Sequence, residues 1–296
     1  MLSVLIPTYN YDVTKLVNSL HQQLISHKNC FEIIIYDDGS KGKTILINDT
    51  LNTLENVTFK SLVTNVGLSN NRNLLAEAAQ YEYLLFIDGD SLIISDQYIV
   101  NFYKSISDNS DIIYGGRIHP EQVQNKRKLR WKYGKQREDL TAKQRSQNQY
   151  KCMFCNNTLM TKTIFKAIGF EKTLSQYGHE DTLFAYKASL IKANIKHIDN
   201  PILHGDVDIS NVFIDKTKKG LENLNYIYKT DLIKIEFIPF LNYYTTLNRL
   251  KVNYLLAYSF PLIKTITKRN LTSKHPSLFL FDLFRISYFC YINRKK

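Results

Sequence analysis

Cysteine is scarce in this sequence, and long uncharged apolar runs are absent. Four cysteines stand at uneven spacings in 296 residues, which makes no disulfide framework and predicts a reducing compartment. Residues 2–7 are a short, mainly apolar run. They are not preceded by the basic region of a secretory signal, and they are shorter than its apolar region. No window reaches the roughly 18 uncharged apolar residues that a membrane-spanning helix needs. We therefore expect a folded protein of the cytoplasm.

Acidic residues are too few to balance the basic ones, and the excess is concentrated. The net charge is +12, from 39 Lys and Arg against 27 Asp and Glu. Residues 126–137 hold seven basic and no acidic residues, and residues 230–296 hold eleven basic and three acidic ones. The rest of the chain therefore carries a small negative net charge. These segments predict contact with phosphates, an anionic membrane or nucleic acid, or else they are a solvated loop and tail.

The first third of the chain alternates strand and helix patterns. Apolar runs that predict buried strands lie at residues 3–6, 31–36, 57–63 and 83–87. Helical spacing separates them, most clearly over residues 13–24. This alternation predicts an α/β fold with a mixed, mainly parallel central sheet and helices on both faces.

Four polar clusters each follow one of these predicted elements. In parallel sheets, ligands bind beyond the carboxyl ends of the strands. We expect all four clusters to converge there; they occupy residues 7–10, 37–40, 65–67 and 88–90.

The remainder of the chain is less regular. Strands are expected at residues 112–114 and 152–160, a helix at 180–193, and a polar, basic insertion at about 121–146. From about residue 230 the composition becomes aromatic, aliphatic and basic. We predict a catalytic domain over residues 1–229 and a helical extension over residues 230–296.

Two aspartates separated by one glycine follow the strand at residues 83–87. Asp88 and Asp90 can both face one hard cation, because Gly89 permits a tight turn and the close approach of a phosphate. Mg²⁺ or Mn²⁺ bound by carboxylates completes its coordination with phosphates and water. The triplet alone fits an ordinary turn better than a metal site.

Five motifs in fixed order give this triplet its context. They are SVLIPTYN at 3–10, IIIYDDGS at 33–40, NVGLSNNRN at 65–73, FIDGD at 86–90 and YGHEDTLFAYK at 177–187. Together they resemble glycosyltransferase family 2, an inverting family with the GT-A (Rossmann-like) fold, over about residues 1–215. The segments LRWKYGKQRE at 129–138 and NPILHGDVDISNVF at 200–213 resemble a bacterial surface-glycan subgroup.

The resemblance implies a nucleotide-sugar site at the carboxyl edge of the sheet. Arg72 can pair there with a phosphate or with a carboxylate, and Asn71 precedes it where the family more often has alanine. Asp88 and Asp90 hold the metal. Asp37 and Asp38 bind the base or ribose, or else cap a helix. The implied nucleotide-sugar residues are Pro7, Thr8, Tyr9, Asn10, Asp37, Asp38, Asn65, Gly67, Arg72, Asn73, Asp88 and Gly89.

Glu180 and Asp181 form the second chemical pair. Inversion needs a base that takes the proton of the acceptor hydroxyl. The resemblance implies that Asp181 is this base and that Glu180 supports it, although both carboxylates also suit a helix N-terminus. His204 is the candidate third metal ligand, since imidazole suits Mn²⁺.

Several other residues have two interpretations. His179 is a candidate acceptor contact, and Trp131 either stacks on a sugar or nucleobase or anchors its loop. Cys152 and Cys155 have CxxC spacing without a second pair, so we expect them to pack as small apolar residues on a strand. Residues 278–292, followed by a basic end that includes Lys295 and Lys296, predict an amphipathic helix on an anionic membrane or a cover for the core.

The sequence thus predicts an inverting, Mn²⁺- or Mg²⁺-dependent glycosyltransferase. The expected donor is a nucleotide-diphosphate sugar, a UDP-sugar first, and the expected acceptor is a hydroxyl of a glycan or lipid-linked molecule in bacterial surface polysaccharide synthesis. The location is cytoplasmic, with peripheral attachment to the inner face of the plasma membrane as a variant. No nucleic-acid partner is expected. The alternatives are a sugar-1-phosphate nucleotidyltransferase, whose glycine-rich phosphate loop is absent, and a non-catalytic module that binds polyanions or membranes.

Overall fold

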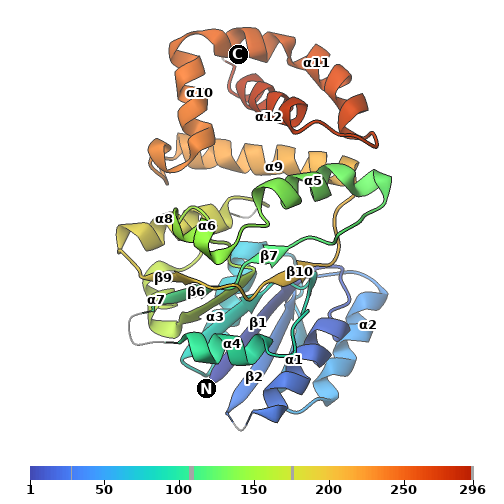
Figure 1. Cartoon of the computed structure of the whole chain (residues 1–296), viewed down its shortest axis with the longest axis vertical. Coiled ribbons are helices and arrows are strands. Elements are labelled where there is room, and N and C mark those ends of the chain that lie inside the picture. Colours follow the sequence, from blue (N-terminus) through green and yellow to red (C-terminus); the bar gives the residue numbers. More distant parts are fainter. Residues whose placement is uncertain (28, 107–109, 175–176, 295–296) are drawn as a thin grey trace. The chain divides into compact units, whose positions relative to one another are not determined.

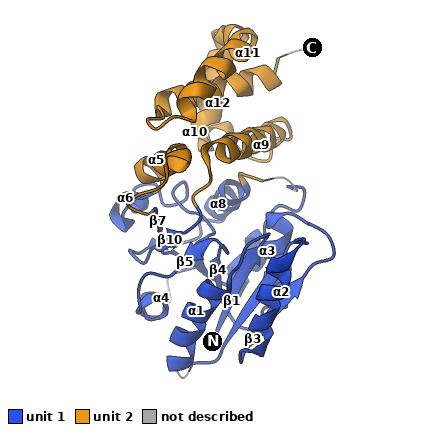
Figure 2. Ribbon diagram, turned by 90° about the vertical axis from the view of Figure 1, so that its right-hand side faces the viewer, with its two compact units in different colours: residues 1–119, 139–175, 180–206 blue, residues 120–138, 176–179, 207–296 orange. Residues whose placement is uncertain are grey.

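The computed structural model describes residues 1–27, 29–106, 110–174 and 177–294, and it contains two compact units (Figures 1 and 2). Apart from the gaps, unit 1 comprises residues 1–119, 139–175 and 180–206, and unit 2 comprises residues 120–138, 176–179 and 207–296. The expected boundary near residue 230 therefore falls inside unit 2. The terminal Lys295 and Lys296 lie outside the described residues.

A seven-stranded sheet forms the centre of unit 1. Its strand order is β3-β2-β1-β4-β8-β6-β9. The neighbours from β3 to β4 are parallel, β8 is antiparallel to β4 and to β6, and β9 is parallel to β6. The predicted mixed, mainly parallel sheet is confirmed. The strands are β1 Leu2–Thr8, β2 Phe31–Asp37, β3 Val57–Ser61, β4 Tyr83–Ile87, β6 Ile112–Tyr114, β8 Asn157–Thr161 and β9 Ile195–His197.

Both faces of this sheet are covered, because its central strands are apolar on both sides. Val4 and Ile6 of β1 point into one core, together with residues of α1 and α4. Phe86 of β4 belongs to the other face, where its ring stacks on Phe165 at 5.4 Å between centroids. Unit 1 contains α1 Thr14–Ser26, α2 Lys43–Asp49, α3 Leu68–Ala78, α4 Tyr98–Ser105, α6 Ala142–Ser146, α7 Lys162–Ile168, α8 Glu180–Leu190 and a 3₁₀ turn at Thr50–Thr53.

A second, three-stranded sheet in unit 1 was not expected from the sequence. Its order is β5-β10-β7, with β5 at Ser91–Leu92, β7 at Arg117–Ile118 and β10 at Ile202–His204. β10 is antiparallel to β5, and His204 is paired with Ser91. Strands of two or three residues give too short a periodic signal to be seen in the sequence. They matter because β5 directly follows the turn at residues 88–90, which is called the aspartate turn below.

The expected strand over residues 152–160 was placed too early. β8 begins at Asn157, so the CxxC segment precedes the strand, and Cys155 is fully buried there. Cys152 is partly exposed, and both cysteines are free thiols. The apolar character of this segment is explained by burial in turns rather than by strand pairing.

Unit 2 consists of helices around an aromatic core. Residues 278–292 do form a helix, α12, and it packs against α9 and α11. Phe281, Phe284 and Phe289 are almost completely buried. These aromatic residues therefore pack in the core of unit 2, rather than covering the core of the predicted catalytic domain, and the membrane interpretation of this segment is not tested. Its helices are α5 Lys128–Arg137, α9 Ser210–Lys229, α10 Pro239–Arg249, α11 Val252–Leu271 and α12 Leu278–Ile292, with 3₁₀ turns at Asn125–Arg127 and Ile235–Phe237.

Within the described residues, no helix has the length and apolar character needed to cross a membrane.

Candidate active site

The loops at the carboxyl ends of β1, β2 and β3 converge as predicted, and Asp38 joins them. Its backbone N–H donates to the carbonyl of Thr8 at 2.8 Å. Its carboxylate accepts from the backbone N–H groups of Val66 at 2.7 Å and Gly67 at 3.0 Å. Burial raises the pKa of Asp38, and these two hydrogen bonds oppose that rise. Asp38 therefore positions the backbone around the predicted nucleotide site.

Asp37 is the other member of this acidic pair, and it is equally buried. Its carboxylate accepts from the backbone N–H of Ser40 at 2.9 Å and from both the Ser40 and Ser61 hydroxyls. Asn10 lies in the left-handed region (φ 51°) and donates its N–H to the Ser40 hydroxyl at 2.6 Å. Tyr9 beside it is 55% exposed, which leaves its ring available to a ligand.

The aspartate turn is held tightly by backbone contacts. The N–H of Ser91 donates to the carbonyl of Asp88 at 3.1 Å, and the N–H of Asp88 donates to the carbonyl of Asn156 at 3.3 Å. A Cβ atom at Gly89 would lie 3.0 Å from Val13 and 3.1 Å from the Thr8 hydroxyl. Glycine is therefore needed where this turn passes β1.

Arg72 connects Asp88 of the aspartate turn with Asp181 of α8. It is fully buried in α3, donating from Nη2 to Asp88 Oδ1 and from Nη1 to Asp181 Oδ1, each at 2.7 Å. Burial would lower the pKa of Arg72, but the charges of Asp181 and Asp88 outweigh it and the net shift is upward. The face of its guanidinium lies 5.1 Å from the ring centre of Phe170. Arg72 thus pairs with carboxylates, one of the two roles predicted for it.

Glu180 and Asp181 occupy the first turn of α8, where negative charge is favoured. Asp181 keeps 18% of its side-chain surface exposed, whereas Glu180 is buried. Burial and the neighbouring charge of Asp181 raise the pKa of Glu180 to about 7. The two adjacent carboxyl groups are therefore in different environments, as a base and its supporting group require.

Cys155 is a member of the site that the sequence did not indicate. Its thiol is fully buried, and burial together with the charge of Asp181 raises the pKa well above its ordinary value, so the thiol stays neutral. Cys155 and Asp181 are therefore neighbours in the site. Nothing in the local sequence predicts this contact, because it joins the segment before β8 to the start of α8.

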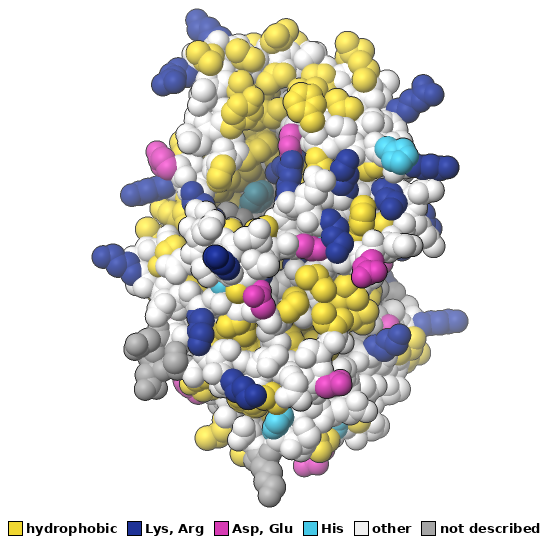
Figure 3. All heavy atoms as spheres, in the orientation of Figure 1, with side chains coloured by type: hydrophobic (Ala, Val, Ile, Leu, Met, Phe, Trp, Pro, Cys, Tyr) yellow, Lys and Arg dark blue, Asp and Glu magenta, His cyan; other side chains and the backbone are white. Residues whose placement is uncertain are grey.

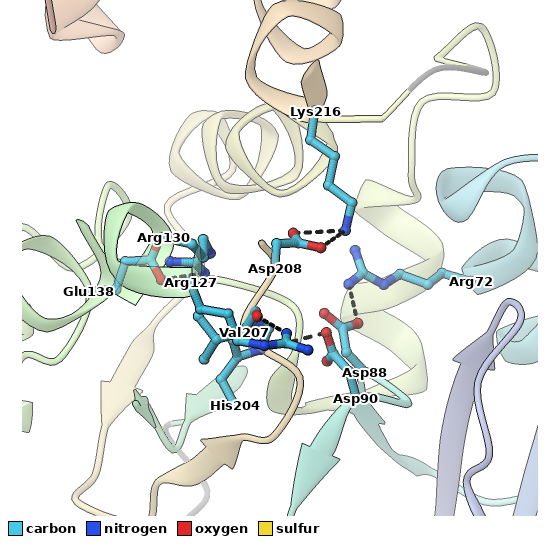
Figure 4. Close-up of polar contacts among 10 residues, drawn as sticks. All are labelled: Arg72, Asp88, Asp90, Arg127, Arg130, Glu138, His204, Val207, Asp208 and Lys216. Carbon is cyan, nitrogen blue, oxygen red and sulfur yellow. Dashed lines mark hydrogen bonds and ion pairs between the residues drawn. The ribbon is translucent and has the colours of Figure 1, made fainter. Parts of the chain in front are cut away.

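Asp90 and His204 are brought together by the small sheet. The pairing of β5 with β10 places His204 Nδ1 3.5 Å from Asp90 Oδ2, and the N–H of Gly205 donates to the carbonyl of Asp90 at 2.9 Å. Figure 4 shows Asp88 and Asp90 near one another, with Arg72 at the first and His204 at the second. The ring of His119 lies 5.2 Å from that of His204 and its Nδ1 contacts Asp139 at 2.6 Å.

The donor atoms of Asp90 and His204 suit a divalent cation. Two neighbouring ligands of one octahedral ion lie about 3.0 Å apart when each bond is about 2.1 Å, close to the 3.5 Å between these atoms. A carboxylate and an imidazole form a donor set that Mn²⁺ accepts. In the part of the chain that the structure describes, however, no three His, Cys, Asp or Glu side chains form a group that could hold a metal. The metal therefore stays a proposal.

Two more of the predicted donor-site residues hold backbone segments. Asn65 donates to the carbonyl of Asp38 at 3.0 Å. Asn73 bonds both the N–H and the carbonyl of Phe170, each at 3.0 Å. Asn73 thus fixes the loop under Arg72.

His179 and Trp131, the predicted acceptor residues, belong to unit 2. Burial, and then the charge of Arg285, lower the pKa of His179 to about 4, so its imidazole is neutral at pH 7. The indole N–H of Trp131 donates to the carbonyl of Pro120 at 2.7 Å, and Lys128 lies over its ring at 4.5 Å. Trp131 therefore anchors its loop, which was one of the two predicted roles.

The arrangement defines a class of protein. It combines a mixed, mainly parallel sheet with the turn at Asp88 and Asp90 after β4, and with Glu180 and Asp181 at the start of α8. The model of Glycosyl transferase family 2 matches residues 3–169, more than half of the chain, and the chain belongs to this family. The described fold is of the GT-A type, as predicted.

Individual relatives are more distant. The poly(ribitol-phosphate) beta-N-acetylglucosaminyltransferase TarS of Staphylococcus aureus is 36% identical over 94 residues, which cover 31% of this chain and 16% of TarS. EpsH of Bacillus subtilis is 24% identical over 237 residues, or 77% of this chain and 67% of EpsH. The match thus spans only a small part of the length of TarS.

Solved structures of low sequence identity share the fold. The crystal structure of TarS residues 1–349 aligns with a TM-score of 0.51 and 23% identity, over 75% of this chain and 64% of that one. The mannosyltransferase PcManGT of Pyrobaculum calidifontis, in complex with GDP-Man and Mn²⁺, aligns with a TM-score of 0.55 and 13% identity, over 77% and 64%.

Removing the charge of Arg72 should strongly destabilise the fold. We expect Arg72→Met to lower the free energy of unfolding by about 3–5 kcal/mol, because two carboxylates lose a buried counterion. The matched control is Arg137→Met, whose partner Asp282 is 44% exposed, and its cost should stay below about 1 kcal/mol. Urea denaturation measures both values. Equal losses in the two variants would contradict the role given to Arg72.

The raised pKa of Glu180 predicts how stability depends on pH. The folded state holds this proton more tightly than the unfolded state, so ionisation makes wild type lose stability as the pH rises from about 4.5 to about 7. Glu180→Gln should therefore gain stability relative to wild type between pH 5 and pH 8, by on the order of 2 kcal/mol.

Glu171→Gln is the control for this measurement. Burial would raise the pKa of Glu171, but the hydrogen bond and charge of Lys187 bring it below its ordinary value. Glu171 is then ionised throughout this pH range, and its variant should differ from wild type by a constant amount. Parallel pH profiles for wild type and Glu180→Gln, measured as melting temperatures, would show that Glu180 does not titrate as described.

Proposed function

We propose that the protein catalyses inverting, metal-dependent transfer of a sugar from a nucleotide-diphosphate donor to a hydroxyl of a bacterial surface glycan. The observation that carries the proposal is the buried Arg72, paired on one side with Asp88 of the aspartate turn and on the other with Asp181 of the acidic pair. This arrangement holds Asp88, on the side of the donor's phosphates, and Asp181, the proposed base, in a fixed position relative to each other. Membership in the family favours glycosyl transfer over the nucleotidyl-transfer and non-catalytic alternatives.

The donor binds, in this proposal, at the carboxyl edge of the seven-stranded sheet. The loops held by Asp37 and Asp38 leave Tyr9 exposed to the nucleoside, and Gly67 adopts a positive φ where these loops meet. TarS has been crystallised with UDP-GlcNAc and with UDP, and PcManGT with GDP-Man. A UDP-sugar is the donor we propose, of hexosyl or N-acetylhexosaminyl type.

Asp90 and His204, joined by Asp88 through its second oxygen, would hold Mn²⁺ or Mg²⁺. When bound, such an ion neutralises the diphosphate that leaves the sugar. The protein's own part is to orient these donors, which β5 and β10 do through their backbone pairing. Arg72 keeps one oxygen of Asp88 paired and so fixes the carboxylate's direction.

Asp181 is the proposed base. Its partial exposure lets it reach an acceptor hydroxyl, whereas Glu180 has no comparable access. The proton of the hydroxyl passes to a carboxylate oxygen of Asp181 as the hydroxyl oxygen attacks the anomeric carbon. Arg72 fixes the orientation of that carboxylate through its hydrogen bond to Oδ1. Glu180, with its raised pKa, supports the base rather than replacing it.

The acceptor is proposed from the relatives. TarS and a Bacillus spizizenii relative are named as poly(ribitol-phosphate) glycosyltransferases, so a hydroxyl of a phosphate-containing surface polymer or of a lipid-linked glycan is the class to test first. His179 stays a candidate acceptor contact, whereas the hydrogen bond of Trp131 to the Pro120 carbonyl favours its anchoring role. The four free cysteines suit a reducing compartment, and we place the reaction in the cytoplasm.

Replacing the proposed base should separate donor binding from transfer. Asp181→Asn should lower kcat by about 10²–10⁴-fold and leave donor affinity within a few-fold of wild type, since the amide cannot take a proton. Transfer is followed as nucleoside diphosphate release from UDP-sugars with Mn²⁺, and donor binding by calorimetry. Asp111→Asn is the control, because the changed carboxylate lies outside the site and accepts a hydrogen bond from the backbone N–H of Asn194. Unchanged turnover by Asp181→Asn would remove Asp181 from this role.

The metal proposal predicts a metal-linked donor affinity that depends on two residues. Wild type should bind a UDP-sugar more tightly when Mn²⁺ is present, and Asp90→Ala should abolish this gain. His204→Ala should reduce it by about tenfold or more. Calorimetric titrations with and without Mn²⁺ measure the gain directly. A metal-dependent gain of full size in Asp90→Ala would show that the ion is held elsewhere.

A further inference from the structure

α11 presents an apolar face that nothing in the described chain covers. Its inner side, which includes Ala257 and Phe260, packs on α12. Its outer side carries four large apolar residues, each between 60% and 73% exposed: Leu255, Tyr258, Leu262 and Ile266. The intervals of three and four residues place them on one face of the helix. A stripe of this size on a protein surface indicates an interaction site.

The apolar surface continues beyond α11 within unit 2. Tyr243 of α10, Leu250 between α10 and α11, and Phe279 of α12 are each more than half exposed. Figure 3 shows apolar side chains gathered over the C-terminal helices, with lysine and arginine side chains around them.

The charges around this surface are of one sign. Between Glu236 and Asp282 the sequence contains no acidic residue. The basic residues in that stretch are Arg249, Lys251, Lys264, Lys268, Arg269 and Lys274. Lys251 directly precedes the first residue of α11, and Arg269 lies three residues after Ile266 in its last turn, so a basic residue stands near each end of the apolar stripe. A ligand that complements this surface presents apolar groups to the stripe and anionic groups to the basic residues near its ends.

We propose that the outer face of α11 binds the surface of an anionic lipid bilayer. Leu255, Leu262 and Ile266 enter the boundary between headgroups and acyl chains, and Tyr258 lies at that boundary with its hydroxyl toward water. Lys251 and Arg269 contact lipid phosphates at the two ends. The membrane contact is therefore on α11 and not on α12, whose aromatic residues form the core of unit 2.

A second copy of the chain fits this surface less well. A symmetric contact through α11 would place the same residues opposite each other, and the acid-free stretch would then bring only like charges together. An anionic bilayer supplies the opposite charge over the whole area. This complementarity is the reason for choosing the lipid surface as the partner.

The hollow on the inner flank of α11 supplies a control. Lys264 and Lys268 line it together with Lys218 and Asp215 of α9. These lysines point to α9 and α12 rather than to the outer face. Their removal changes the charge of α11 without changing the stripe or its basic ends.

The experiment is co-sedimentation of the full-length protein with vesicles. Wild type should bind vesicles of phosphatidylcholine that contain about one third phosphatidylglycerol, and binding should weaken as salt rises. Leu255→Gln/Leu262→Gln should lower the partition coefficient by at least about tenfold without a change in melting temperature, because both side chains are exposed. The matched control is Leu46→Gln/Val63→Gln, two apolar residues of unit 1 that are at least as exposed, and this variant should bind like wild type.

A second pair of variants tests the basic ends. Lys251→Gln/Arg269→Gln should weaken binding by about 10–30-fold, and Lys264→Gln/Lys268→Gln, of equal charge, should weaken it less. Equal losses in both pairs, or equal binding to pure phosphatidylcholine, would overturn the proposed geometry. So would light scattering that shows a wild-type dimer converted to a monomer by Leu255→Gln/Leu262→Gln. Sugar transfer to a small soluble acceptor should be unchanged in these variants, which keeps this test separate from the proposed function.

Discussion

The double ion pair of Arg72 is the interaction on which the candidate site depends. A guanidinium taken out of water is stable only if its charge is matched, and here two carboxylates match it from opposite sides. The separation along the chain is 16 residues to Asp88 and 109 to Asp181. One buried cation thus connects the end of β4 with the start of α8, and neither acid can move without exposing a charge to the interior.

The proposed metal ligands Asp90 and His204 are positioned in a different way. Asp90 and His204 are not linked through a buried cation but through the pairing of two very short strands, β5 and β10. Backbone hydrogen bonds fix the register, and the register alone decides which side chains face each other. Because Asp181 is held by the buried ion pairs of Arg72, whereas Asp90 and His204 are positioned by backbone pairing, the proposed base and these two proposed metal ligands can be altered independently. That independence is what makes variants of Asp181 and Asp90 informative about separate steps.

The sequence predicts the parts of the site that follow from local pattern. Apolar runs ending in polar clusters indicate parallel strands, and parallel strands bring Asp38 and Asp88 to one edge. The motif order then identifies the family. The contact of Cys155 with Asp181 and the second sheet could not be predicted, because both join segments far apart in sequence and neither leaves a periodic signal. The domain boundary near residue 230 was predicted from a change in composition. The extent of unit 2 depends instead on packing, because α5 and α9 pack with α12.

The charge distribution acquires a physical meaning once the two units are known. Both basic segments, residues 126–137 and 230–296, belong to unit 2 except for the last residue pair outside the described chain. Outside these segments the chain carries a small negative net charge. Most of the described cations of unit 2 are exposed, and exposed cations act on large anionic surfaces because their fields add. The proposed transfer chemistry therefore lies on residues of unit 1, and the proposed contact with an extended anionic partner lies on unit 2.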